Sequence, residues 1–197
     1  MQELKDIVAG IRELFPGLIG LAGLLEEGVM RPDPALPDES SLILSRVRRL
    51  AYSLCRELTG TAAEDPSAFR YISLPGHMER ICDHFENLSG LLKMKAAQDI
   101  QFSDKAADEM HCLFERLKDM LSSASGRLSR DVSGAGNVRE AWLAMLRNAS
   151  DSAALHEERL REGICLPKTH ALYMDLMEEI KAIAWHVKRM ARDLPAA

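Results

Sequence analysis

Aromatic residues are scarce in this sequence and make up only 5% of its 197 residues. Strands are enriched in aromatic and β-branched residues, and no segment alternates apolar and polar residues between turn signals. Leucine, alanine and methionine supply most of the apolar content, and these residues favour helices. The composition therefore predicts an all-α protein rather than one built on a sheet.

The sequence also lacks the short motifs of common catalytic and metal sites. It has no Gly-x-Ser-x-Gly elbow, no glycine loop that would cradle a phosphate, and no His-x-x-x-His or His-Glu-x-x-His pattern. Paired Glu-x-x-His motifs, which a ferritin-like enzyme requires, are missing as well. Nothing in the spacing of residues therefore indicates catalysis.

The four cysteines do not form a Cys-x-x-Cys pair, which excludes a zinc knuckle and a thioredoxin-like motif. Their wide spacing in a chain of this length is not typical of a disulfide scaffold. We expect reduced core thiols of a cytosolic protein. The cysteines are Cys55, Cys82, Cys112 and Cys165.

Long apolar runs and concentrated positive charge are missing too. The longest apolar run, 14–25, is interrupted by Pro16 and three glycines and ends before Glu26. A membrane span needs about twenty apolar residues, so the run predicts a buried or interface helix, with membrane contact as the alternative.

The net charge is -5, and the basic residues are spread along the chain. We therefore expect no nucleic-acid partner.

What the sequence does contain is a repeated ladder of apolar residues. Two segments have apolar residues at steps of four, three, four, three and four, and an offset of 102 residues relates them throughout. This spacing predicts two helices that each bury one face against neighbouring helices. The rungs are Leu74, Met78, Ile81, Phe85, Leu88 and Leu92, and Leu176, Ile180, Ile183, Val187, Met190 and Leu194.

Weaker matches at offsets of 102 and 99 relate the two segments before each ladder. Proline, glycine and serine punctuation separates six segments, which predicts six helices in two tandem antiparallel three-helix bundles. The predicted halves are 1–99 and 100–197. Pro16 predicts a kink in the first helix or a start near that residue. The other predicted boundaries are the start signals 38–40, the turns 60–66, 133–136 and 163–167, and a cap at Ser103 or Asp104.

The polar residues of the first ladder segment are the strongest candidates for a site. Glu79, Asp83 and Asn87 follow one another at steps of four, so they stack on one helix face. Two carboxylates and an amide could ligate a metal ion. The alternative is a solvated face with Arg80 as a counter-ion. The offset of 102 also relates His84 to His186. A histidine at the same position of both segments favours a structural role beside the core.

The stretch Met78-Glu79-Arg80-Ile81-Cys82-Asp83-His84-Phe85-Glu86-Asn87-Leu88 resembles the signature helix of PhoU-like proteins, Glu-Arg-Ile-x-Asp-His-x-x-Asn-Ile. The resemblance continues at 102–106, and segments 155–163 and 173–183 resemble the C-terminal PhoU-like domain of sodium–phosphate cotransporters. It covers roughly residues 70 to 194. The family's six-helix fold agrees with the fold that the repeat predicts.

The resemblance implies a non-enzymatic regulator of phosphate transport and phosphate signalling. Its partner would be a membrane phosphate transporter or its sensor kinase, and it would act in the cytoplasm or at the inner face of the membrane. Some family members bind iron- or zinc-type clusters through Glu-x-x-x-Asp motifs in both repeats. Glu79 and Asp83 match that motif, which implies a divalent or ferric ion there.

The second repeat departs from the family pattern. The offset of 102 places Lys181 and Trp185 where the first repeat has its two carboxylates, and neither residue can replace a carboxylate ligand. We expect no second metal site, and Trp185 becomes a candidate interface residue, with packing against another helix as the alternative. A metal-binding bundle and a helical adaptor unrelated to phosphate are the alternative functions, and a homodimer is left open.

Overall fold

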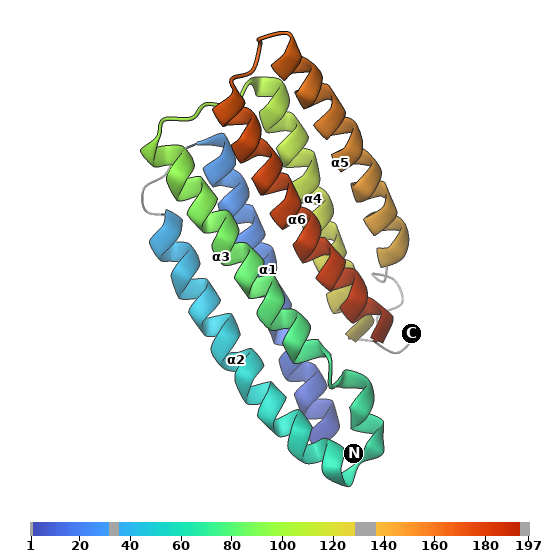
Figure 1. Cartoon of the computed structure of the whole chain (residues 1–197). Helices are drawn as coiled ribbons and strands as arrows, with labels where there is room; N and C mark the ends of the chain where they lie inside the picture. Colours follow the sequence, from blue (N-terminus) through green and yellow to red (C-terminus); the bar gives the residue numbers. More distant parts are fainter. Residues whose placement is uncertain (1, 32–35, 129–136, 194–197) are drawn as a thin grey trace.

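The computed structural model describes residues 2–31, 36–128 and 137–193, and these residues form helices and no strand. The all-α prediction is therefore confirmed. The α-helices are α1 (Gln2–Met30), α2 (Leu36–Glu64), α3 (Leu74–Ala97), α4 (Asp104–Leu128), α5 (Val138–Arg161) and α6 (Pro167–Asp193), and a short 3-10 helix, η1 (Pro66–Tyr71), connects α2 to α3 (Figure 1).

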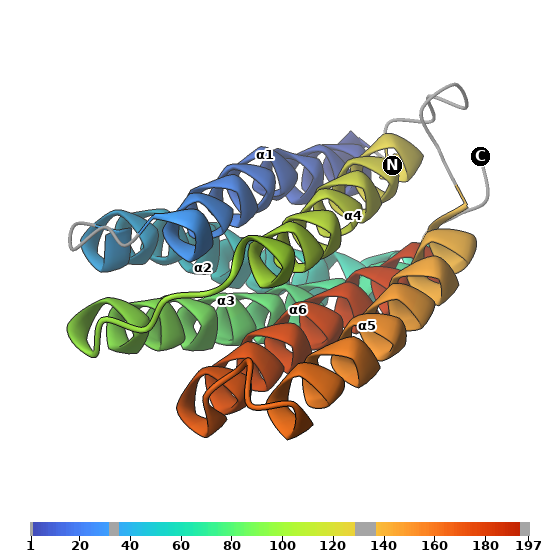
Figure 2. The same ribbon diagram turned by 90° about the horizontal axis from the view of Figure 1, so that it is seen from above.

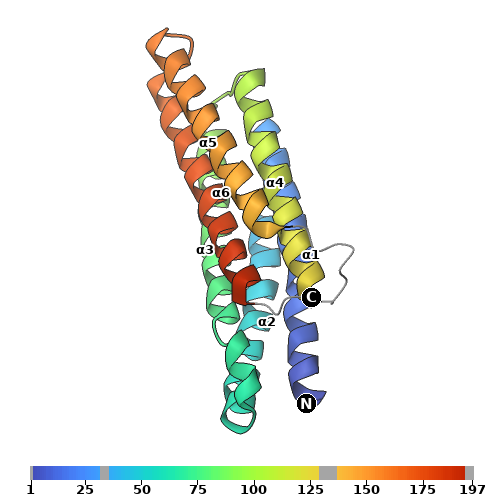
Figure 3. The same ribbon diagram turned by 90° about the vertical axis from the view of Figure 1, so that its right-hand side faces the viewer.

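The helices form two three-helix bundles, as predicted. Helices α1, α2 and α3 pack together, α4, α5 and α6 pack together, and the bundles meet through α1 against α4 and α3 against α6 (Figure 2). The predicted division between 99 and 100 lies in the connection from α3 to α4. One continuous apolar core runs through both halves. The start of α1, the end of α2 and η1 extend past the second bundle at one end (Figure 3).

Both ladders face this core. Every rung from Leu74 to Leu92 and from Leu176 to Met190 is at most 4% exposed, while the last rung, Leu194, lies outside the described residues. A helix buries one face when its apolar residues recur at steps of three and four. The ladders therefore determine which face of α3 and of α6 points outward.

Helices α3 and α6 run antiparallel, and the repeat makes their contact nearly symmetric. His77 meets His186 at one end of the contact, and His84 meets Glu179 at the other. The offset of 102 relates position 77 to 179 and position 84 to 186, so Glu179 corresponds to His77 and His186 to His84. Each contact is thus the counterpart of the other about a pseudo-twofold axis, although one joins two imidazoles and the other an imidazole and a carboxylate.

Two expectations about where helices start or end are wrong. Helix α1 does not start near Pro16, because it extends from Gln2 to Met30 with this proline inside it. The kink at Pro16 stays a prediction. Helix α2 begins before the start signal at Asp38 and continues through Gly60 to Glu64. A glycine costs a helix only about 1 kcal/mol, and burial of Leu58 and Ala62 on either side of it offsets that cost.

Other predicted boundaries are confirmed. The Ser103 Oγ accepts a hydrogen bond from the Ala106 N–H at 3.3 Å and caps α4. Gly163 adopts a φ of +71° after α5, a conformation that glycine reaches without strain, and α6 begins at Pro167. The predicted turn at 133–136 lies outside the described residues.

The expectation that all four cysteines are core thiols is wrong. All four are free, but Cys55 is exposed, Cys112 and Cys165 are half-buried, and only Cys82 lies in the core. Burial raises the pKa of the Cys82 thiol to about 12. Cysteine spacing carries no information about burial, because the exposed position of Cys55 depends on which face of α2 packs inward.

Helix α1 contains the apolar run 14–25 and, among the described residues, is the one helix long and apolar enough to cross a membrane by length and composition. One of its faces is part of the core, where Leu14, Leu18, Leu21 and Leu25 are at most 2% exposed. The run therefore forms a core helix, as its interruption by proline and glycine predicts.

Candidate functional site

The outward face of α3 is held by an arginine from the neighbouring helix. The Arg48 Nη2 of α2 donates to the Asp83 Oδ1 and to the Glu86 Oε2, at 2.8 Å in each case. The Arg80 Nη1 lies 3.4 Å from the other Asp83 oxygen. The carboxylate of Asp83 is therefore shared between two guanidinium groups.

Glu79, the other residue of the Glu-x-x-x-Asp motif, is exposed and has no ion pair or hydrogen bond from its side chain within the described part of the chain. In the described part of the chain, Glu79 and Asp83 do not form a group with a third metal-ligand residue. A metal ion at this face would compete with Arg48 and Arg80 for Asp83. The metal site at Glu79 and Asp83 thus stays a prediction.

The remaining polar residues of the signature lie in the contact between α3 and α6. The His84 Nδ1 is 2.7 Å from the Glu179 Oε2, and the Asn87 Nδ2 donates to the Glu179 Oε1 at 3.2 Å. His84 and Asn87 therefore both bind one carboxylate of the opposite half. This agrees with a structural role for His84 and shows that Asn87 holds the halves together.

A histidine pair occupies the other end of this contact. The Nδ1 atoms of His77 and His186 lie 2.9 Å apart, so one ring donates and the other accepts. Burial, together with the neighbouring imidazoles of His77 and His84, lowers the pKa of His186 to about 4. The pair is therefore neutral at physiological pH.

Trp185 lies next to this histidine pair on α6. It is 39% exposed, its ring meets that of His186 edge-on at 4.8 Å between centroids, and the guanidinium carbon of Arg189 lies 5.3 Å from its ring centroid. The Trp185 ring is thus held in place by His186 and Arg189 and is partly exposed to solvent. Rigid aromatic side chains of this kind anchor protein interfaces.

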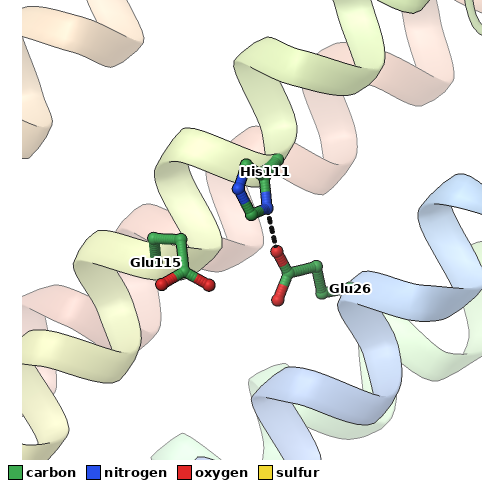
Figure 4. Close-up of side chains that lie close together, drawn as sticks. All are labelled: Glu26, His111 and Glu115. Atoms are coloured by element: carbon green, nitrogen blue, oxygen red, sulfur yellow. Dashed lines mark hydrogen bonds and ion pairs between the residues drawn. The ribbon is translucent and has the colours of Figure 1, made fainter.

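One group in the described part of the chain has three metal-ligand residues close together: Glu26 of α1 with His111 and Glu115 of α4 (Figure 4). Glu26 is buried and is hydrogen-bonded to the His111 Nδ1. The Lys118 Nζ lies 2.7 Å from the Glu26 Oε2 and also pairs with Glu115. The lysine ammonium already pairs with both carboxylates, so this group is an ion-pair cluster that joins the two halves.

A buried polar cluster lies inside the second half. The Arg159 guanidinium donates two hydrogen bonds to Glu109 at 2.7 and 2.9 Å, and the Tyr173 hydroxyl donates to the same carboxylate at 2.8 Å. The Glu109 and Arg159 side chains are only 12% and 11% exposed. This is the most buried ion pair in the described structure, and it stabilises the packing of α4, α5 and α6.

His156 extends this cluster toward the turn after α5. Its ring stacks on Tyr173 with 3.9 Å between centroids, its Nδ1 accepts from the Arg159 Nη2 at 2.9 Å, and its Nε2 lies 3.3 Å from the Cys165 Sγ. Because Arg159 is a donor only, the neutral imidazole carries its proton on Nε2. Burial, with the charge of Arg159, lowers the pKa of His156 to about 4.

Sequence reasoning missed Arg48, Glu179, Glu109 and Lys118. Each meets its partner across 35 or more residues of sequence. No local motif connects such pairs, and the helix packing alone brings them together.

Comparison with known proteins identifies the fold. No family model and no curated protein matches the sequence. Among solved structures, the chain is similar to PhoU from Pseudomonas aeruginosa, with a TM-score of 0.87 and 12% sequence identity over 98% of this chain and 95% of that one. It is also similar to a PhoU-like phosphate regulatory protein from Shewanella oneidensis, with a TM-score of 0.61 and 15% identity over 95% and 96% of the two chains.

A further PhoU-like protein from Shewanella oneidensis gives a TM-score of 0.59 and 16% identity over 95% of this chain and 96% of that one. The chain therefore has the PhoU-like fold that the α3 motif and the repeat predicted. Identities this low establish the fold and leave the function to be argued from the residues.

Proposed function

We propose that this chain is a PhoU-like regulator of phosphate transport or of phosphate-responsive signalling, which acts by protein–protein contact. The observation that carries the proposal is the likeness to PhoU from Pseudomonas aeruginosa over 98% of the chain. The stretch 78–88 on α3 supports it independently of the fold, since its residues resemble the PhoU-like signature. The proposed role is regulatory and requires no catalysis.

The proposed partner is a phosphate transporter or its sensor kinase, reached from the cytoplasmic side of the membrane. The outward face of α6 around Trp185 is the proposed docking surface, because it combines an exposed aromatic ring with the charged side chain of Arg189. Partner binding would then be coupled to the packing of α3 against α6 directly beneath this surface.

Deletion of the gene tests the regulatory role. We expect phosphate-responsive gene expression to become insensitive to external phosphate, measured with a reporter at high and low phosphate. Normal regulation after deletion contradicts the proposal.

Co-purification with membranes tests the docking surface. A tagged chain is expected to recover a phosphate transporter or sensor kinase, and Trp185→Ala is expected to reduce the recovery about tenfold, the loss typical of an interface hot spot. Tyr52→Ala is the control, because Tyr52 is an exposed aromatic residue on α2, outside this surface. Equal recovery by both variants removes Trp185 from the interface.

A further inference from the structure

The end of α4, the start of α5 and the end of α6 lie together at one end of the second half (Figure 1). A pocket of about 580 Å³ lies among these helix ends. Half of its ten lining residues are cationic, and none of them is acidic, although the chain as a whole has a net charge of -5. The cationic residues are Arg127, Arg139, Lys188, Arg189 and Arg192. This is a strong local concentration of positive charge.

Most of these cations have no carboxylate to neutralise them within the described structure. The Nε atoms of Arg127 and Arg189 are shielded from water and have no hydrogen-bond acceptor there. Lys188 lies over the ring of Trp142, with its Nζ 5.1 Å from the ring centroid, while Arg192 pairs with Asp193. The pocket therefore gathers cationic groups whose charge is mostly not offset by a carboxylate of the described structure, and such a site favours an anionic ligand.

The charge of this pocket is a property of the second half alone. Three of its cations lie on α6, and the repeat places uncharged or acidic residues at the matching positions of α3. The matching residues, 102 positions earlier, are Glu86, Asn87 and Gly90. The core and the repeat therefore do not require these cations, and α5 adds the positive end of its helix dipole at Asn137 and Val138.

We propose that this pocket binds a chain of linked phosphate groups, either inorganic polyphosphate or the polyphosphate of a nucleotide. Guanidinium groups match the geometry of phosphate oxygens and bind them in pairs. Five cations exceed what a single orthophosphate needs, and the volume lies in the usual range for small-molecule sites, about 300–1,000 Å³. The proposal goes beyond the regulatory role and does not depend on transporter docking.

Calorimetric titration of the purified chain with tripolyphosphate and with ATP tests the proposal. We expect both to bind, and the Arg127→Gln/Arg189→Gln variant to bind at least about tenfold more weakly, because charge-assisted hydrogen bonds are lost. Arg46→Gln/Arg49→Gln is the matched control, since it removes the same charge from the exposed face of α2. Its affinities should stay within about twofold, because salt screens distant charges.

A Trp142→Leu variant distinguishes the two ligand sources. If the variant binds ATP more weakly than the wild type and tripolyphosphate equally well, the ligand is a nucleotide. If the variant binds each of the two ligands as tightly as the wild type does, the ligand is the phosphate chain itself. The proposal is overturned if neither ligand binds, if orthophosphate or sulfate binds as tightly, or if the α2 control loses as much affinity.

Circular dichroism and the Tm of each variant show whether it is folded. If the double arginine variant does not fold, Arg139→Gln and Lys188→Gln carry the same test. Normal phosphate regulation after gene deletion would remove the proposed function and leave this binding result intact, so the two failures are distinguishable.

Discussion

The two halves of the molecule share their apolar seams and differ in the faces around them. On α3, Asp83 and Glu86 hold Arg48 of α2. At the matching positions of α6 lie Trp185 and Lys188, and Lys188 helps to line a cationic pocket. Packing demands that buried positions keep their shape, whereas exposed positions are free to change charge. The repeat therefore preserves the apolar seams of α3 and α6, while the exposed faces of these helices differ in charge.

The interiors differ as well. Glu109 of α4 lies in the buried cluster with Arg159 and Tyr173, while the matching residue of the first half is Ile7, which is 1% exposed. At this position the first half thus has an apolar side chain in its core, and the second half has an ion pair. A buried ion pair demands that both partners be present, so the second half is the more vulnerable to single substitutions.

The largest expected effect is on the buried ion pair. Glu109→Leu should lower the free energy of unfolding by about 3–5 kcal/mol, because it leaves Arg159 buried without a counter-charge. Adding Arg159→Leu should restore part of this loss. Urea unfolding followed by circular dichroism measures both variants, and a loss below about 1 kcal/mol in the single variant would show that water replaces the pair.

A smaller effect is expected from pH. The pKa of His156 in the folded protein is about 4, below its ordinary value of 6.5, so the unfolded chain binds the proton more tightly. The stability contributed by neutral His156 is present above about pH 6.5 and is lost as the pH falls toward 4. At pH 5 the loss in the free energy of unfolding is about 2 kcal/mol. The stability difference between wild type and His156→Gln should therefore shrink by that amount from pH 7.5 to pH 5.0. A pH-independent difference contradicts this.

The smallest stability effect is expected on the face of α3. Asp83→Ala breaks the contacts with Arg48 and Arg80 but should change the free energy of unfolding by less than about 1 kcal/mol, because these side chains are 36% to 69% exposed and water screens their charges. If Glu79 and Asp83 bind a divalent or ferric ion, elemental analysis will find that ion in the wild type and not in this variant. Equal metal content in both proteins removes the site.

Much of the fold could be predicted because helix periodicity is local. The ladders predicted the inward faces of α3 and α6, and Ser103, Gly163 and Pro167 predicted helix ends. The predicted helix start near Pro16 and the predicted turn at Gly60 were wrong, because tertiary packing outweighs the local cost of a poor helix residue. The motif residues of α3 were identified correctly as a polar face, but their partners Arg48 and Glu179 could not be, since they come from other helices.

The sequence by itself determined the helical class, the repeat and the two seams, because each depends on the spacing of residues within one helix. Tertiary structure alone decided which charges meet across different helices. Arg127, Arg139 and Arg189 belong to three different helices and look like scattered surface residues in the sequence, yet three helix ends bring them to one pocket. Electrostatic interaction depends on distance in space, and only the packing of the helices sets that distance.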